Sequence, residues 1–437
     1  MAAADRFLLT YSDLLPLWQD WIITEPKPPM DRWLKQPQRF PKNSHHAYRI
    51  RVNNGLLEAV RFQQLADALE FTLSDPDFDN WGRWDESWSA AEGGMSTPQH
   101  FWYWVQLRSQ SDWRTPDLPQ QKSRREHFLD WQKAMQSCEE LTPRFLLWHG
   151  IRPGWLPALR QRAKRSGWSE QELLNWVRLQ STRPPLWLRR ADDAPLEEME
   201  QELVNEGIDI RIQDGELTAL GGRSIHQTAA YKAGRIEVQD IASQMLCQQL
   251  GVEPGYKVWD ACAGAGGKTL TLASALKGKG AVVATDHHAF KLDELKRRAK
   301  RAGVANIRSF EWDGEAPLRL PAEIKRQQGF DRILVDAPCS NSGTWRRNPD
   351  ARWRLSHQDT AELNEIQLKL LTHASAALRE NGKLLYATCS WQAEENEQLV
   401  ARFLEQNPGW KCERQAMVGA PIRDSDTMFY ALLVKAD

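Results

Sequence analysis

The chain has 437 residues, more than one hydrophobic core usually serves, so two or three domains are expected. A formal net charge of −1 argues against a general polyanion binder, and no run of eighteen apolar residues predicts a membrane span. The six cysteines lack CxxC spacing, which disfavours a zinc site and a disulfide framework. Without a basic run before an apolar stretch at its start, the sequence predicts a soluble, cytoplasmic protein with no bound metal and no membrane contact.

The first predicted domain, residues 1–140, is rich in tryptophan. It holds ten of the twenty-one tryptophans of the chain, and the stretch 55–71 has the apolar spacing of a helix. Stacking of these rings on bases is one interpretation, but packing in a core is what large aromatic side chains most often do. We therefore expect a mainly helical domain, and we assign these tryptophans no site.

The second predicted domain, residues 141–235, begins with a basic segment. Residues 141–190 contain ten Arg or Lys and two Glu, a balance that favours contact with phosphates, although a solvated helix face would have the same composition. After Pro184 and Pro185, the mixture of short apolar runs and a helical pattern predicts a small α/β module. We expect this domain to bind RNA.

The third predicted domain, residues 236–437, alternates short apolar runs with helical ones. This alternation is typical of a parallel sheet with crossover helices, so the expected fold class is α/β, with a doubly wound, Rossmann-like sheet. The carboxyl edge of such a sheet is where ligands bind. The chemistry is therefore expected in this domain.

A glycine-rich turn follows the first strand candidate of this domain. A Walker phosphate loop would need glycine where Cys262 stands, and the dinucleotide pattern would need Gly or Ala where Thr269 stands. What remains is a loop led by Asp260, suited to a cofactor with an amino-acid tail and a ribose. Asp286 ends the next strand candidate and Asp313 ends the one after it, so three acids are expected at one sheet edge.

Two cysteines also follow strand candidates. The run 330–340 ends in Asp336, Ala337, Pro338 and Cys339, and the run 382–390 ends in Thr388 and Cys389. If these two strands are neighbours, both thiols face the same crevice as the cofactor. A lone cysteine would be interpreted as a small buried hydrophobe. Two at equivalent strand ends, beside a cofactor loop, indicate reactivity instead.

On these residues the chain resembles the Sun/Nop/Nol family of RNA 5-methylcytosine methyltransferases, from about residue 145 to 435. The matching stretches are RPPLWLR (183–189), GRIEVQDIASQ (234–244), DACAGAGGKT (260–269), DRILVDAPCS (331–340), RRNPDARW (346–353), LLYATCSWQAEEN (384–396) and FYALLVK (429–435).

The resemblance implies S-adenosyl-L-methionine as cofactor and Cys389 as the covalent nucleophile. Cys339 corresponds to the cysteine that assists product release, and Asp336 to the acid that holds the cytosine. A nucleophilic thiolate divides one difficult methyl transfer into easier steps. The cofactor-binding positions implied are Asp260, Ala261, Cys262, Ala263, Gly264, Gly266, Gly267, Lys268, Asp286, Asp313 and Asp336.

The expected partner is RNA, ribosomal RNA in the first place and transfer RNA as an alternative. Arg346, Arg347 and Arg352 follow Cys339 and are candidates to hold the phosphates that flank the target, although a solvated turn explains them as well. Because the target base must leave any stack, a single-stranded or flippable cytosine is expected. Two other hypotheses stay open: a non-catalytic RNA-binding ribosome-assembly factor, and a DNA cytosine methyltransferase that uses the cysteine of the Pro-Cys pair.

Overall fold

The fold is that of a computed structural model. Residues 1–8, part of the start of the chain from which a soluble protein was predicted, lie outside the residues that the structure describes. The described residues are 9–40, 44–90, 94–191 and 194–436. Within them, no helix combines the length and the apolar character that crossing a membrane requires.

The chain forms two compact units with an interrupted boundary. One unit comprises Met1–Arg183 and Trp345–Leu355, and the other comprises Pro184–Thr344 and Ser356–Asp437. Residues 141–183, which the sequence analysis grouped with the small α/β module, thus belong with the N-terminal helices. Segment 345–355 is part of the first unit, although the stretches before and after it belong to the second.

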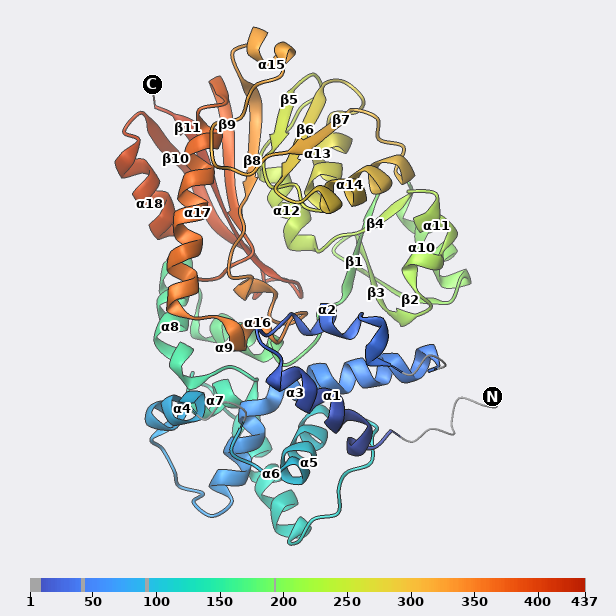
Figure 1. Cartoon of the computed structure of the whole chain (residues 1–437), viewed down its shortest axis with the longest axis vertical. Coiled ribbons are helices and arrows are strands. Elements are labelled where there is room, and N and C mark those ends of the chain that lie inside the picture. Colours follow the sequence, from blue (N-terminus) through green and yellow to red (C-terminus); the bar gives the residue numbers. More distant parts are fainter. Residues whose placement is uncertain (1–8, 41–43, 91–93, 192–193, 437) are drawn as a thin grey trace. The chain divides into compact units, whose positions relative to one another are not determined.

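The first unit is helical, as predicted for its N-terminal part. Tryptophans fill its interior: Trp102 and Trp104 are fully buried, and the Trp102 ring meets those of Trp18 and Trp113 at centroid distances of 6.1 and 5.9 Å. The helices, labelled in Figure 1, are α1 (Tyr11–Ile23), α2 (Met30–Leu34), α3 (His46–Thr72), α4 (Trp81–Ala90), α5 (Pro98–Ser109), α6 (Gln121–Gln136), α7 (Pro143–Trp148), α8 (Leu156–Ser166), α9 (Glu170–Leu179) and α16 (Ala351–Arg354).

The second unit begins with a small antiparallel sheet in the order β2-β3-β1-β4, which corresponds to the predicted small α/β module. Leu188, Leu203, Ile208 and Leu217 are buried in its own apolar cluster. Its elements are β1 (Leu186–Arg190), α10 (Leu196–Asn205), β2 (Ile208–Gln213), β3 (Glu216–Gly222), α11 (Ala229–Lys232) and β4 (Ile236–Val238).

The larger sheet has seven strands in the order β10-β11-β9-β8-β5-β6-β7, parallel from β9 to β7, with two antiparallel strands at the other edge. The expected doubly wound α/β fold is confirmed, because β5 pairs with β6 on one side and with β8 on the other. Its strands are β5 (Lys257–Asp260), β6 (Ala281–Asp286), β7 (Ile307–Glu311), β8 (Phe330–Asp336), β9 (Leu378–Thr388), β10 (Trp410–Gly419) and β11 (Thr427–Lys435).

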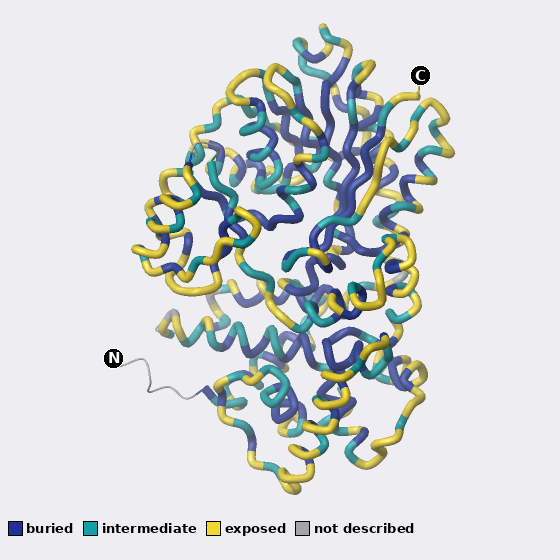
Figure 2. Tube along the Cα trace, turned by 180° about the vertical axis from the view of Figure 1, so that it is seen from behind, coloured by how far each residue is buried: buried dark blue, intermediate teal, exposed yellow. Residues whose placement is uncertain are grey.

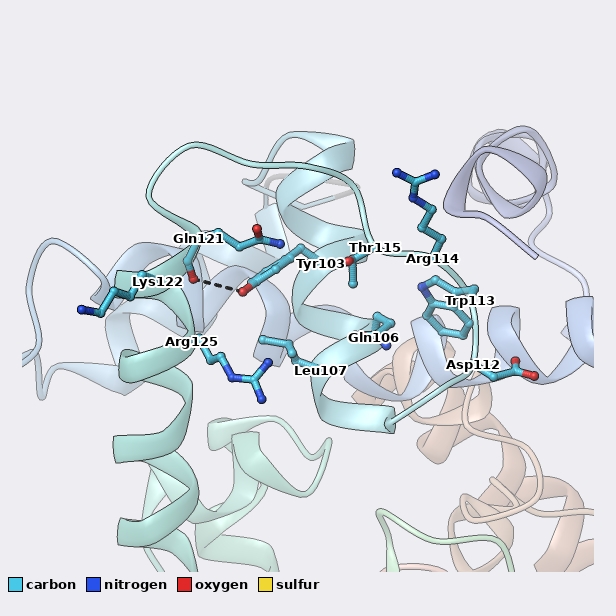
Figure 3. A pocket seen from close by; sticks show the side chains of 10 residues that line it. All are labelled: Tyr103, Gln106, Leu107, Asp112, Trp113, Arg114, Thr115, Gln121, Lys122 and Arg125. Atoms are coloured by element: carbon cyan, nitrogen blue, oxygen red, sulfur yellow. Dashed lines mark hydrogen bonds between the residues drawn. The ribbon is translucent and has the colours of Figure 1, made fainter. Parts of the chain in front are cut away.

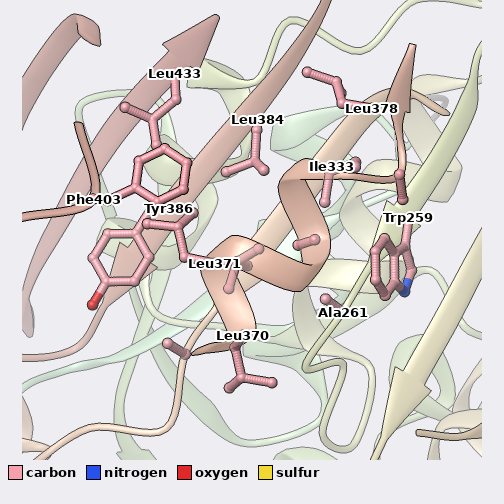
Figure 4. Close-up of a cluster of buried hydrophobic side chains, with 14 of the residues drawn as sticks. Trp259, Ala261, Ile333, Leu370, Leu371, Leu378, Leu384, Tyr386, Phe403 and Leu433 are labelled. Carbon is pink, nitrogen blue, oxygen red and sulfur yellow. The ribbon is translucent and has the colours of Figure 1, made fainter. Parts of the chain in front are cut away.

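Alternate side chains of the central strands point to opposite faces of this sheet. On β8, Ile333 and Val335 join one buried cluster with side chains of α17 and α18, whereas Leu334 joins another with side chains of α12 and α13. Figure 4 shows the first cluster, and Figure 2 shows that these strands are buried along most of their length. The helices of this part are α12 (Ile241–Gln249), α13 (Gly267–Ala275), α14 (Ala289–Arg301), α15 (Ala322–Arg326), α17 (His357–Ser375) and α18 (Glu397–Gln406).

Candidate active site

The glycine-rich loop joins β5 to α13 at the carboxyl edge of the sheet. Gly264 and Gly266 have φ angles of 54° and 87°, in the left-handed region that favours glycine. A Cβ on Gly266 would lie 2.6 Å from Cγ of Leu295, whereas a Cβ on Gly264 would meet nothing within 4 Å. Backbone and packing therefore both require glycine at 266, while the backbone at 264 faces open space.

The three residues before Gly264 anchor this loop to the sheet. The Ala261 N–H donates to the carbonyl of Leu334 at 2.9 Å, and the Ala263 N–H donates to the carbonyl of Thr285 at 2.8 Å. The Cys262 side chain packs against the core cluster, and burial raises the pKa of its thiol well above the usual range. These bonds hold the loop against the sheet, and the open space beside the loop begins at the Cα of Gly264.

Asp260, the last residue of β5, is almost completely buried, with 1% of its surface exposed. Its Oδ2 accepts a hydrogen bond from the Thr269 hydroxyl at 2.6 Å, while its buried Oδ1 has no partner among the described residues. Burial, together with the nearby carboxylate of Asp336 and against the effect of the Thr269 bond, raises the pKa of Asp260 to about 7. A buried acceptor without a partner favours a ligand that donates to it.

Asp286, at the end of β6, holds the loop from the other side. Its Oδ2 accepts from the Gly264 N–H and its Oδ1 from the His288 N–H, both at 2.9 Å. The Lys291 ammonium lies 3.5 Å from Oδ1. Asp286 thus fixes the glycine turn while one edge of its carboxylate remains near a cation.

Asp313 lies farther from its strand than the sequence analysis expected. β7 ends at Glu311, and the exposed Asp313 accepts from the Glu315 N–H at 3.0 Å. This bond is that of a turn-forming aspartate. Its place beyond the third strand end remains compatible with the predicted role, without a contact that supports it.

Lys268 and Asp336 link the glycine loop to the catalytic strand. α13 begins at Gly267, and the Lys268 Nζ donates to Oδ2 of Asp336, the last residue of β8, at 2.7 Å. Burial disfavours the charged ammonium, but the adjacent carboxylate of Asp336 outweighs it and raises the pKa of Lys268. The ion pair places Asp336 at the mouth of the predicted cofactor site.

The two predicted thiols meet. Asp336 on β8 pairs in parallel with Ala387 on β9, so the loops after the two strands start side by side. Sγ of Cys339 lies 3.3 Å from Sγ of Cys389; Cys339 is buried, whereas Cys389 is partly exposed. The hydrogen bond with Cys389, with burial second, raises the pKa of Cys339 well above the usual range. Of the two, Cys389 is the thiol that a substrate can reach.

Asn341 is a site residue that the sequence analysis did not single out. Its Oδ1 accepts from Cys389 Sγ at 3.1 Å, and its Nδ2 donates to the carbonyl of Cys339 at 3.0 Å. Its φ of 56° is left-handed, a conformation that asparagine tolerates better than most residues. An asparagine in the turn just after the Pro-Cys pair was the available signal.

The expectation that Arg346 and Arg352 hold substrate phosphates is corrected by their burial. Each is 1% exposed within the helical unit. Arg346 donates to the Thr182 hydroxyl at 3.0 Å, and Arg352 donates to the Trp345 carbonyl at 2.9 Å. Guanidiniums that are buried on such acceptors serve packing. Arg347 is exposed and stays a candidate for RNA contact.

Neither of two cavities in the structure contains a predicted site residue. One, of about 710 Å³, belongs to the helical unit and is drawn in Figure 3, where side chains of α5, of α6 and of the loop between them line it; another, of about 410 Å³, lies beside β1, α12 and α13. The described residues contain no cluster of three His, Cys, Asp or Glu side chains that could hold a metal ion. The candidate site is therefore identified by the reactive side chains at the strand ends and not by a cavity.

Residues 247–431 match the family model described as 16S rRNA methyltransferase RsmB/F. The chain is also 30% identical over 299 residues to ribosomal RNA small subunit methyltransferase B of Yersinia pseudotuberculosis, which covers 66% of the chain and 67% of that protein. The chain belongs to the RsmB/F methyltransferase family. It is 31% identical over 265 residues to the probable small subunit methyltransferase B of Bacillus subtilis, and spans 57% of that relative's length.

Solved structures share the fold of this RsmB/F family member. The crystal structure of PH0851 has a TM-score of 0.67 at 24% identity and covers 97% of this chain and 98% of that one. NSun6 from Pyrococcus horikoshii, solved with SFG, has a TM-score of 0.53 at 17% identity and covers 64% of this chain and 98% of that one. The first likeness extends over both units.

Proposed function

We propose that this RsmB/F family member transfers a methyl group from S-adenosyl-L-methionine to carbon 5 of a cytosine in RNA, through a covalent bond between Cys389 and the base. One observation carries the proposal: the thiols of Cys339 and Cys389 lie 3.3 Å apart at the ends of adjacent parallel strands. The Lys268–Asp336 ion pair connects this position to the glycine loop. A nucleophile, a second thiol and a cofactor loop thus converge on one sheet edge.

The residues around the loop fit the cofactor. The buried Oδ1 of Asp260 has no partner among the described residues, so it can accept a hydrogen bond from a ligand, and the missing side chain of Gly264 leaves space beside the loop. When bound, S-adenosyl-L-methionine supplies an electrophilic methyl group. The residues that would hold this cofactor are Asp260, Gly264, Gly266, Gly267, Lys268, Asp286, Asp313 and Asp336. Ala261, Cys262 and Ala263 would shape the loop.

The proposed role of Cys389 follows from the weak nucleophilicity of cytosine carbon 5. Addition of the Cys389 thiolate to carbon 6 breaks the ring double bond and makes carbon 5 enamine-like, able to take a methyl group. Loss of the carbon 5 proton to a base and departure of the thiolate then restore the double bond. Covalent catalysis of this kind divides one hard step into easier ones.

Asp336 and Cys339 have different proposed tasks. Asp336, a quarter exposed and held by Lys268, can accept from the exocyclic amine of cytosine or from a protonated ring nitrogen, which stabilises the adduct and disfavours uracil. Cys339, held as a neutral thiol by its neighbour and by burial, is suited to assist elimination of the product rather than to attack.

Ribosomal RNA is the proposed substrate, because the relatives from Yersinia and Bacillus are described as ribosomal RNA small subunit methyltransferases. This substrate implies a cytoplasmic location. Transfer RNA is the second candidate. The proposed phosphate contacts are Arg347 and the exposed basic residues Arg160, Lys164, Arg165 and Arg183, which would add affinity without specifying sequence. The presence of both thiols and Asp336 in one arrangement disfavours a non-catalytic assembly factor.

The test is methyl transfer from labelled S-adenosyl-L-methionine to ribosomal RNA, transfer RNA and DNA by the protein and two variants. We expect transfer to ribosomal RNA, loss of transfer in Cys389→Ala, and in Cys339→Ala an RNA–protein adduct that survives denaturing electrophoresis. The adduct is expected because attack remains possible while elimination is slowed. Loss of all attack in Cys339→Ala, with transfer retained in Cys389→Ala, would reverse the two roles. No transfer to any nucleic acid would favour the assembly factor.

A further inference from the structure

A buried carboxylate lies beneath the two thiol-bearing loops. Glu395 follows Cys389 by six residues in the turn before α18, and none of its surface is exposed. Its neighbour Glu394 is exposed to solvent. A fully buried carboxylate is costly unless donors surround it, so its partners indicate why it is there.

Donors surround both of its oxygens. Oε1 accepts from the Ser340 N–H at 2.8 Å and from Nε2 of Gln367 at 3.0 Å. Oε2 accepts from the Ser340 hydroxyl and, at 3.3 Å, from Nε2 of Gln392. In all four hydrogen bonds the partner is the donor and Glu395 is the acceptor. The arrangement therefore requires a side chain at this position that only accepts.

These donors come from three different segments. Ser340 is the residue after Cys339, Gln392 lies three residues after Cys389, and Gln367 is on α17, where it also donates to the carbonyl of Pro338 at 3.0 Å. The carbonyl of Glu395 accepts from the Tyr386 hydroxyl on β9 at 2.7 Å. One carboxylate thus joins the loop of Cys339, the turn after Cys389 and a helix packed on the sheet.

Serine hydroxyls complete the connection. The Ser340 hydroxyl lies 3.2 Å from that of Ser390, which lies 2.9 Å from that of Ser342. The Ser342 hydroxyl accepts from the Trp391 N–H at 3.1 Å. All these side chains are buried, and of the two thiols only Cys389 is partly exposed, so water cannot replace a lost bond in the network without rearrangement.

We propose that Glu395 is a positioning residue, whose buried carboxylate ties the loop of Cys339 to the turn after Cys389 and so sets the spacing of the two thiols. Its effect on catalysis rests on the proposed function, whereas its effect on thiol spacing does not. Glutamine at this position would direct an amide N–H₂ toward the donors on one side, whichever way the amide turns, and would push one loop from its place.

The experiment measures thiol spacing directly in the full chain. Diamide oxidises two adjacent thiols to a disulfide, while its N=N bond takes up the two electrons and two protons; peptide mass mapping then follows formation of the Cys339–Cys389 bond. Because disulfide formation depends steeply on geometry, we expect Glu395→Gln to slow it about tenfold. Methyl transfer should fall on the order of 100-fold in kcat, with the Kd for S-adenosylhomocysteine unchanged.

The matched control is Glu394→Gln, which makes the same chemical change on the exposed neighbour and should leave both rates as in the unsubstituted chain. A disulfide rate in Glu395→Gln equal to that of the control overturns the proposal, whatever happens to methyl transfer. If Glu395→Gln does not fold, Ser340→Ala removes one side-chain donor and retains the backbone one. A slowed disulfide rate in Ser340→Ala then supports the proposal, and an unchanged rate rejects it.

Discussion

At the scale of single residues, Asp260 links protonation to ligand binding. Its carboxyl group has a pKa of about 7 in the folded chain, above its ordinary value of 3.8, because it is buried. The folded state therefore holds more protons than the unfolded state between these values. The free energy of unfolding consequently decreases as pH rises through this window, and the contribution of the protonated group is lost above about pH 7.

A ligand that donates a hydrogen bond to Asp260 should bind the ionised form. We therefore expect the Kd for S-adenosylhomocysteine to fall by about tenfold between pH 6 and pH 8, as measured by calorimetry, since a group with a pKa near 7 ionises in this range. Asp260→Asn should bind more weakly and with little dependence on pH. An equal pH dependence in Asp260→Asn would show that another group is responsible.

Individual residues also show where sequence reasoning succeeds. The proximity of the Cys339 and Cys389 thiols was predictable, because the ends of adjacent parallel strands lie at the same edge of the sheet. The burial of Arg352 was not, since its acceptors lie on distant parts of the chain, such as the Gly150 carbonyl. Glu395 lies within a stretch that resembles the family, yet no periodicity in 391–396 distinguishes it from Glu394.

At the scale of elements, the β5–α13 loop depends on one glycine more than on its neighbours. Gly266→Ala should reduce stability by about 1 kcal/mol for the left-handed backbone and by a further 1–3 kcal/mol for contact with Leu295. Gly278→Ala is the control, because Gly278 has a φ of 72° but open space around its Cβ position. Urea denaturation should give the larger loss for Gly266→Ala, and equal losses would exclude the contact with Leu295.

The strands were predicted more accurately than their ends. Apolar runs located β5, β6, β8 and β9, because buried parallel strands are nearly continuous in apolar residues. β7 has no buried residue and ends at Glu311 rather than at 313, since it lies at the edge of the sheet, where burial does not mark its end. Beyond the strand, the Asp313 side chain closes a turn by accepting from the Glu315 N–H, and such a turn has no periodic pattern in the sequence.

At the scale of the whole molecule, the boundary between units could not be derived from composition. Segment 345–355 belongs to the helical unit although both flanking stretches belong to the other. Its contacts include a hydrogen bond from Trp353 Nε1 to the Val60 carbonyl at 2.7 Å, and Trp345 is fully buried. The sequence motif identifies the segment. It does not indicate that the segment packs against residues almost 300 positions earlier in the chain.

This connection predicts how a truncated chain behaves. Residues 184–437 alone would leave Trp345 and Trp353 without their partners, so we expect strong binding of the dye anilinonaphthalene sulfonate and a tendency to aggregate. The same truncated chain with 345–355 replaced by an equally long Gly-Ser linker should bind less dye. Equal dye fluorescence from the two chains would show that the segment is not what the truncation exposes.

The interrupted boundary also affects how the protein responds to cleavage. If a protease site were inserted at 183–184, the cut would cleave one of the three chain connections between the units, and the two fragments would stay together. The carboxyl-terminal fragment would stay bound to the amino-terminal one through the buried ring of Trp345 and the guanidinium of Arg352. The nicked protein would elute as one species from a sizing column, and would come apart only under denaturing conditions.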